Sequence, residues 1–141
     1  MNSLLLHEQP PANALKWDMY NINYQNVIDV LLEAVPELAR DQEVIDLKNE
    51  CGPHVVFGEL THFVINQYRC GNVGEGSAFQ RIMCFLDACL KSADIEVVNL
   101  VEVSFIENLH AAGGDYQGLK SKLTRDLKRE LEAKDGKNPI F

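Results

Sequence analysis

The sequence predicts an all-α fold, a single compact bundle of five to six helices. Apolar residues recur at three- and four-residue intervals through most of the chain, and no segment shows clean two-residue alternation. Prolines and glycines fall mostly between the periodic segments. The chain has 141 residues, 46% of them hydrophobic, which suits one domain with a buried core. We expect an extended N-terminal arm (1–22), a helical domain (23–134) and a C-terminal tail (135–141).

Three helical segments are predicted in the first half of the domain. Asn23 is a good N-cap for a helix with apolar residues from position 27 to position 35. Pro36 either kinks that helix or starts a second one, which would run to about Glu50. A stop at Cys51-Gly52 is followed by a start at Pro53, because apolar residues again recur at helical spacing from there.

The second half is predicted to hold three more helices. Ser77 is an N-cap after a glycine-rich loop, and its helix would close at Lys91. Asp94 opens the next helix, and residues 94–110 are apolar on nearly all sides, which is typical of a helix buried among others. After a Gly-Gly break, Asp115 can cap a last helix. That helix has one narrow stripe of leucines and an otherwise charged, largely basic surface.

Charge is distributed unevenly along the chain. Residues 1–119 hold 17 acidic and 6 basic side chains, whereas residues 120–141 hold 4 acidic and 7 basic ones, and the total is −8. Such an acidic body repels nucleic acid and anionic membranes and attracts basic protein surfaces. The sequence has no apolar run that could span a bilayer and no secretory signal pattern. We therefore expect a cytoplasmic protein that contacts neither membrane nor nucleic acid directly.

Two Glu-x-x-His motifs are the strongest indication of catalytic chemistry. They comprise Glu59 with His62 and Glu107 with His110, and di-iron carboxylate bundles use such motifs when they face a shared interior. Helical spacing places His62 opposite the apolar face of its helix, and Glu107 falls on a polar edge. We therefore expect no metal and no cofactor, and a metal-dependent helical enzyme built on these four residues remains the alternative.

Nucleophilic catalysis has less support. Ser104 lies within an apolar helical stretch, and no glycine-rich elbow precedes any serine. His54 and Glu59 could form an acid–base pair, but a His and a Glu a helical turn apart are common by chance. The sequence thus predicts a binding protein and not an enzyme.

Two stretches of the chain are similar to a known group of proteins. They are Pro53-His54-Val55-Val56-Phe57-Gly58-Glu59-Leu60-Thr61-His62-Phe63-Val64 and the Val-x-Asn-Leu-Val-x-Val-x-Phe-x-Glu-Asn-Leu run within residues 94–109. Over residues 24–110 the chain resembles a family of small helical bacterial proteins. Some of these look like immunity proteins of polymorphic toxin and contact-dependent growth-inhibition systems. The resemblance implies a cytosolic protein that binds and blocks one toxin domain.

The expected partner is a cognate toxin with a basic nuclease domain, because an acidic inhibitor associates rapidly with a cationic active site. Trp17 or Tyr20 could add an aromatic anchor. A regulatory adaptor that binds an unrelated protein is a further alternative. The acids expected to contact the partner are Glu33, Glu37, Asp41, Glu43, Asp46, Glu59 and Glu75.

Overall fold

Helices account for all regular secondary structure in the part of the chain that the computed structural model describes, residues 21–137. The all-α prediction is confirmed for these residues. Most of the predicted arm, including Trp17 and Tyr20, lies outside them, as do residues 138–141 of the predicted tail. The elements are α2 (Val27–Ala34), α3 (Pro36–Ala39), α4 (Gln42–Glu50), α5 (Pro53–Arg69), α6 (Ala78–Leu90), α7 (Ile95–Asn99), the π-helix η2 (Leu100–Ile106), the 3-10 helix η3 (Glu107–Asp115), α8 (Tyr116–Ser121) and α9 (Arg125–Lys137).

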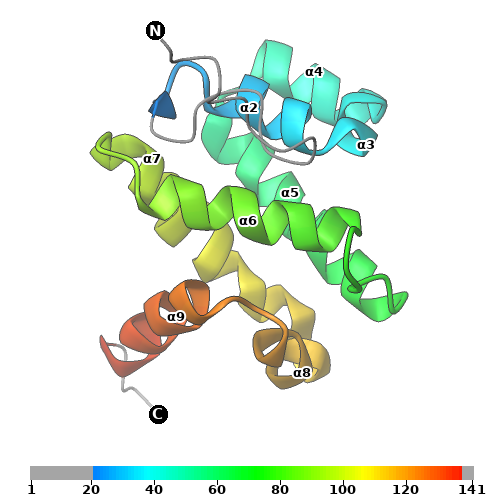
Figure 1. The fold of residues 1–141 in the computed structure, drawn as a ribbon, viewed down its shortest axis with the longest axis vertical. Coiled ribbons are helices and arrows are strands. Elements are labelled where there is room, and N and C mark those ends of the chain that lie inside the picture. The colour runs from blue at the N-terminus through cyan, green and yellow to red at the C-terminus, as the bar shows by residue number, and fades with distance from the viewer. Residues whose placement is uncertain (1–20, 138–141) are drawn as a thin grey trace, which may run out of the picture.

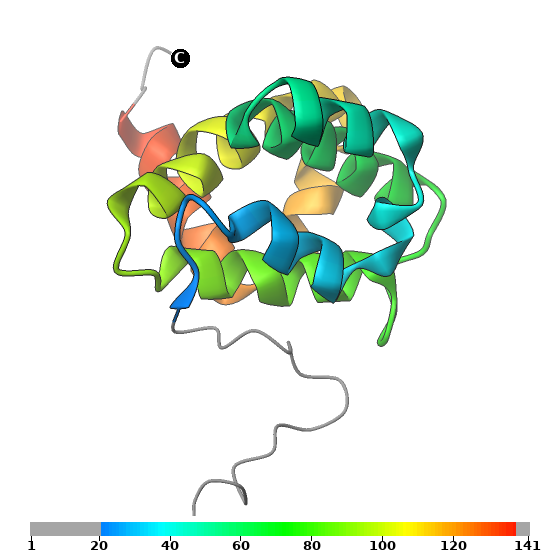
Figure 2. The ribbon, with the colours of Figure 1, turned by 90° about the horizontal axis from the view of Figure 1, so that it is seen from above.

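The helices are arranged along one long axis. α2, α3 and α4 gather at one end, α8 and α9 lie at the other, and α5 and α6 pass through the middle (Figure 1). Figure 2 shows α6 on one side of the molecule and α5 on the other, with α2 beside α6. Helix α5 packs most extensively against η2. Phe57 of α5 and Phe85 of α6 meet in the core with ring centroids 6.0 Å apart.

The first predicted helix begins three residues later than expected. Asn26 and not Asn23 precedes α2, and Asn23 instead accepts the backbone N–H groups of Gln25 and Asn26 in the preceding turn. Pro36 starts a new helix, α3, at its first position. The predicted second segment is divided, because the Asp41 side chain accepts backbone N–H groups and thereby caps α4.

The helix starts at Pro53 and Ser77 are confirmed. Pro53 occupies the first turn of α5, where its missing N–H has no cost. The Ser77 hydroxyl accepts the N–H of Gln80 at 3.2 Å and caps α6. The loop between the two helices turns through Gly71 and Gly76, whose φ angles of 77° and 82° are left-handed and favour glycine.

The 94–110 segment is helical, but it is not one regular α-helix, and the prediction that it is buried among other helices is wrong for one face, on which Ile95 and Val103 are exposed. Asp94 caps α7 as predicted, and the chain then widens into the π-helix η2 and tightens into the 3-10 helix η3. At the change of winding, the Ser104 carbonyl accepts the Asn108 side-chain amide at 2.8 Å. The same carbonyl lies 3.3 Å from the Thr61 hydroxyl, whose proton it shares with the Phe57 carbonyl at 3.0 Å. Side chains thus compete for an acceptor of the helical ladder.

The single last helix predicted from Asp115 onward is wrong. The chain breaks after Ser121, and Thr124 starts α9 by accepting the N–H of Leu127 at 3.3 Å. Asp115 makes no capping hydrogen bond, and its carboxylate instead accepts Arg69 Nε at 2.8 Å. Because three predicted helices are divided, the described residues contain more helical segments than the five or six expected.

The leucine stripe of the last segment does face inward on both sides of the break. Its buried members are Leu119, Leu123, Leu127 and Leu131. No helix within the described range is both long and apolar enough to cross a membrane.

Candidate functional site

Most of the acids predicted to contact a partner lie at one end of the molecule. Residues 27–50, which form α2, α3 and α4, hold seven acidic and two basic side chains. We call this segment the acidic end. The predicted set places five members here, and the structure brings these five together at the top of Figure 1. Glu59 is half-buried on α5, and Glu75 is exposed in the loop before α6.

Glu37 is already bound within the molecule. Arg81 of α6 donates from Nη1 to Oε1 at 2.8 Å and from Nη2 to Oε2 at 2.6 Å, a two-pronged ion pair between α6 and α3. The hydrogen bond from Arg81 lowers the pKa of Glu37 to about 2. The sequence predicted an exposed acid available to a partner, and the structure shows a carboxylate whose two oxygens are both occupied.

Asp41 and Asp46 are also engaged locally. Asp41 caps α4, and Asp46 accepts the side-chain amide of Gln42, one turn earlier, at 2.8 Å. By contrast, four of the predicted acids form no ion pair and no side-chain hydrogen bond with any described residue; these are Glu33, Glu43, Glu59 and Glu75. Within the acidic end, Glu33 and Glu43 therefore remain available to an external cation.

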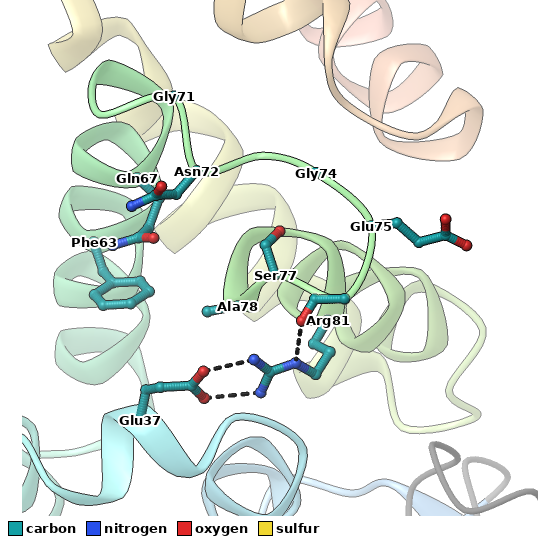
Figure 3. Close-up of a pocket in the computed structure, with 11 residues that line it drawn as sticks. Glu37, Phe63, Gln67, Gly71, Asn72, Gly74, Glu75, Ser77, Ala78 and Arg81 are labelled. Carbon is teal, nitrogen blue, oxygen red and sulfur yellow. Dashed lines mark hydrogen bonds and ion pairs between the residues drawn. The ribbon is translucent and has the colours of Figure 1, made fainter.

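A groove lies beside the Glu37–Arg81 pair. It runs between α3, the end of α5, the loop at residues 71–77 and the start of α6, with a volume of about 630 Å³ (Figure 3). Phe63 forms its apolar wall, and Gln67 and Asn72 contribute amides. Glu75 points away from the ion pair (Figure 3). Because Glu37 neutralises Arg81, Glu75 is the one charged residue lining this groove that has no ion pair with a described residue.

Arg81 also ties the groove to the rest of the fold. Its guanidinium donates to the backbone carbonyls of Ala34 and Gly76, each at 3.4 Å. One side chain of α6 therefore fixes the end of α2, the helix α3 and the loop before α6. This bracing fixes the position of the acidic end relative to α6.

His54 and Ser104 form a pair that the sequence reasoning did not predict. His54 Nδ1 lies 2.5 Å from the Ser104 hydroxyl, and Ser104 is buried in η2. The two residues are 50 positions apart, so no local spacing could have revealed the contact. No carboxylate of the described residues hydrogen-bonds the His54 ring. The pair joins α5 to η2, and Thr61 of α5 contacts the Ser104 carbonyl in the same seam.

Three of the four residues of the metal-enzyme alternative are occupied otherwise or face solvent, and the fourth, Glu59, is half-buried. His62 is exposed, Glu107 pairs with Lys134 at 2.7 Å, and the His110 ring stacks on Tyr116 with centroids 4.3 Å apart. Within residues 21–137, no group of three or more His, Cys, Asp or Glu side chains could hold a metal ion. The arrangement of the described residues therefore gives this alternative no support.

Comparison with known proteins adds one finding. A family model described as a domain of unknown function (DUF7674) matches residues 28–137, a span that includes α3 to α9, nearly all of the acidic end and the groove. No curated protein and no solved structure matches the chain.

Proposed function

This chain belongs to the DUF7674 family of domains of unknown function, so the family does not indicate a function. From the surface of the chain itself, we propose that it is an immunity-type inhibitor. It binds a basic toxin domain, a nuclease, through the acidic end and blocks the active site of that toxin. It acts in the cytoplasm of the cell that the toxin enters. The partner is recognised by its cationic surface, so the interaction needs neither a cofactor nor catalysis by this chain.

The separation of charge along the long axis carries this proposal. The acidic end has a net charge of −5, whereas residues 116–137, which form α8 and α9 at the opposite end, have a net charge of +3. A basic partner is therefore attracted to one end of the molecule and repelled by the other. Such a field orients the partner during approach and accelerates association.

The acidic end combines this charge with a fixed geometry. Arg81 holds α3 to α6, and Lys48 of α4 pairs with Asp29 of α2 at 3.4 Å. Glu33 and Glu43 have no such internal cation among the described residues. A partner that supplies lysine or arginine to them meets a surface whose backbone is already ordered, which limits the entropy lost on binding.

Co-expression tests the proposal. The product of the open reading frame directly upstream is expressed in cells with this chain, without it, and with a Glu33→Lys/Glu43→Lys variant. We expect the wild-type chain to restore growth and the variant to bind the toxic product about tenfold more weakly or worse. A Lys122→Glu/Arg125→Glu variant at the opposite end is the matched control and should protect fully. An upstream product that is harmless, or that kills equally well beside the wild-type chain, would refute the proposal.

A further inference from the structure

The described residues leave three large hydrophobic side chains exposed. They are Val55, Ile95 and Val103, with 46%, 67% and 46% of their surfaces exposed. Val55 lies in the first turn of α5, Ile95 begins α7, and Val103 lies in η2. We call these three residues the aliphatic patch. Helices α5 and η2, which carry two of its members, form the most extensive helix pair in the structure.

The change of helical winding aligns Ile95 with Val103. Four residues exceed one turn of α-helix by about 40°, so Asn99 is turned slightly past Ile95. Four residues fall short of one turn in the wider π-helix, so Val103 is turned back by a similar amount. Ile95, Asn99 and Val103 are all exposed and therefore form a straight row on the surface. In an uninterrupted α-helix this row would curve around the axis.

A contact across the seam places Val55 near this row. The hydrogen bond between His54 and Ser104 joins the residue before Val55 to the residue after Val103. The two valines are therefore held at the same level of the α5–η2 seam. Ile95 and Val103 are eight residues apart, at most about 12 Å along the axis at α-helical rise, and less because the wider π-helix rises less per residue. This spacing is close to two turns of a helix, the distance between positions i and i+7 on a partner helix.

Carboxylates surround the aliphatic patch. Glu96 follows Ile95 and Glu102 precedes Val103 in the chain, whereas Glu59 lies one turn beyond Val55 on α5. None of the three forms an ion pair with a described residue. An apolar row bordered by uncompensated negative charge is complementary to a helix that has an apolar stripe between lysines or arginines.

We propose that the aliphatic patch, with its border of Glu59, Glu96 and Glu102, binds a basic amphipathic helix of a protein partner. A second copy of this chain fits poorly, because a two-fold contact would bring this acidic border against the same acidic border of the other copy. Three aliphatic side chains are also few for a stable dimer interface. An anionic membrane surface is repelled by the same carboxylates. The patch lies outside the acidic end, so this proposal does not depend on the proposed function.

A synthetic helical peptide tests the proposal directly. The probe has leucines at positions i, i+4 and i+7 and lysines on both sides of that stripe, and its fluorescence anisotropy reports binding to the full chain. We expect an Ile95→Ser/Val103→Ser variant to bind it about tenfold more weakly. An Ala39→Ser/Ala133→Ser variant, which alters two exposed alanines elsewhere, should bind like the wild-type chain. Equal binding to the Ile95→Ser/Val103→Ser variant and the wild-type chain would overturn the proposal.

Two further measurements distinguish this surface from general acidity. A Glu96→Gln/Glu102→Gln variant should bind the peptide with a weaker salt dependence, whereas Glu33→Gln/Glu43→Gln at the acidic end should leave it unchanged. A peptide of the same composition with its leucines scattered around the helix should bind weakly. Equal binding of the scattered peptide overturns the proposal. The proposal is also overturned if the wild-type chain forms a dimer, or binds phosphatidylserine vesicles, and the Ile95→Ser/Val103→Ser variant does not.

Discussion

Arg81 of α6 holds Glu37 of α3 through two parallel hydrogen bonds, 2.8 and 2.6 Å long, between residues 44 positions apart in the chain. The same guanidinium reaches the carbonyls of Ala34 and Gly76. The pair therefore joins the acidic end to the central helix at the edge of the groove. Both side chains remain partly exposed, at 34% for Arg81 and 40% for Glu37, so solvent weakens the attraction between them.

Glu37→Gln should lower the free energy of unfolding modestly. The substitution keeps one acceptor for Arg81 but removes the charge and the two-pronged geometry, for an expected loss of about 0.5–1 kcal/mol. Urea unfolding monitored by circular dichroism measures the change. Glu43→Gln is the control, because Glu43 has no ion pair among the described residues, and its stability should equal that of the wild-type chain. Equal stabilities of Glu37→Gln and Glu43→Gln would show that the pair contributes nothing.

The advantage of the wild-type chain over Glu37→Gln should depend on pH. The hydrogen bond from Arg81 lowers the pKa of Glu37 from its ordinary value of 4.5 to about 2 in the folded chain. A lowered carboxyl pKa stabilises the fold above the unfolded value and loses this contribution as pH falls through the folded value. The difference in unfolding free energy between the two proteins should be full at pH 6 and should shrink between about pH 4.5 and pH 2. A difference that is constant over this range would contradict the assigned pKa.

Local signals in the sequence predicted most helix starts, because a cap is decided within a few residues. The starts at Pro53, Ser77 and Asp94 follow from proline geometry and from side chains that accept nearby N–H groups. The missed starts at Asp41 and Thr124 are local caps as well, and only their competition with longer helical patterns concealed them. The missed change of winding, by contrast, involves a distant residue. The winding of η2 involves Thr61 of α5, 43 residues from Ser104, and no periodicity within η2 encodes that donor.

The candidate site was predicted less completely, for the same reason. The exposure of Glu33 and Glu43 follows from the helical patterns, and both are exposed in the structure. The occupation of Glu37 by Arg81 requires α3 and α6 to meet, which the sequence does not reveal. Likewise, each Glu-x-x-His motif is local, whereas metal binding would require two of them to converge.

Thr124→Val should destabilise the last helix and its attachment to α6. The Thr124 hydroxyl accepts the N–H of Leu127 and donates to Asp87 at 2.7 Å, so valine removes a cap and a donor to a half-buried carboxylate. We expect a loss of about 1–2 kcal/mol in the free energy of unfolding. Thr124→Ser keeps the hydroxyl and should lose much less. If the valine and serine variants unfold alike, the hydroxyl has neither role.

The loss caused by Thr124→Val should also become smaller in acid. Burial raises the pKa of Asp87, and the hydrogen bond from Thr124 opposes this shift by stabilising the ionised form. Above the pKa of Asp87 the valine variant leaves an ionised carboxylate without that donor, whereas below it the carboxyl is neutral and needs the donor less. The unfolding free energies of the wild-type chain and the variant, measured across the acid range, should therefore approach each other as pH falls. Divergence would mean that the hydroxyl does not act on the ionised carboxylate.

Gly118→Ala should destabilise the protein although alanine favours helix. Gly118 lies inside α8, and a Cβ there would overlap the Tyr68 hydroxyl and come within 3.1 Å of Tyr68 Cζ. Tyr68 of α5 is packed against the core, so the overlap can be relieved only if the Tyr68 ring moves. We expect a loss of about 1–2 kcal/mol by thermal unfolding.

Gly58→Ala is the matched control, since a Cβ at Gly58 meets only the side-chain amide of Asn108 at an ordinary 3.8 Å. Alanine at this position of α5 should raise the free energy of unfolding by about 0.5–1 kcal/mol, because it reduces the conformational freedom of the unfolded chain. The two glycines thus predict opposite signs for the same substitution. In a Tyr68→Phe background the loss at Gly118 should be partly relieved, because the overlapping oxygen is absent while the ring carbon stays close. A Gly118→Ala variant as stable as Gly58→Ala would show that α8 does not pack closely on Tyr68.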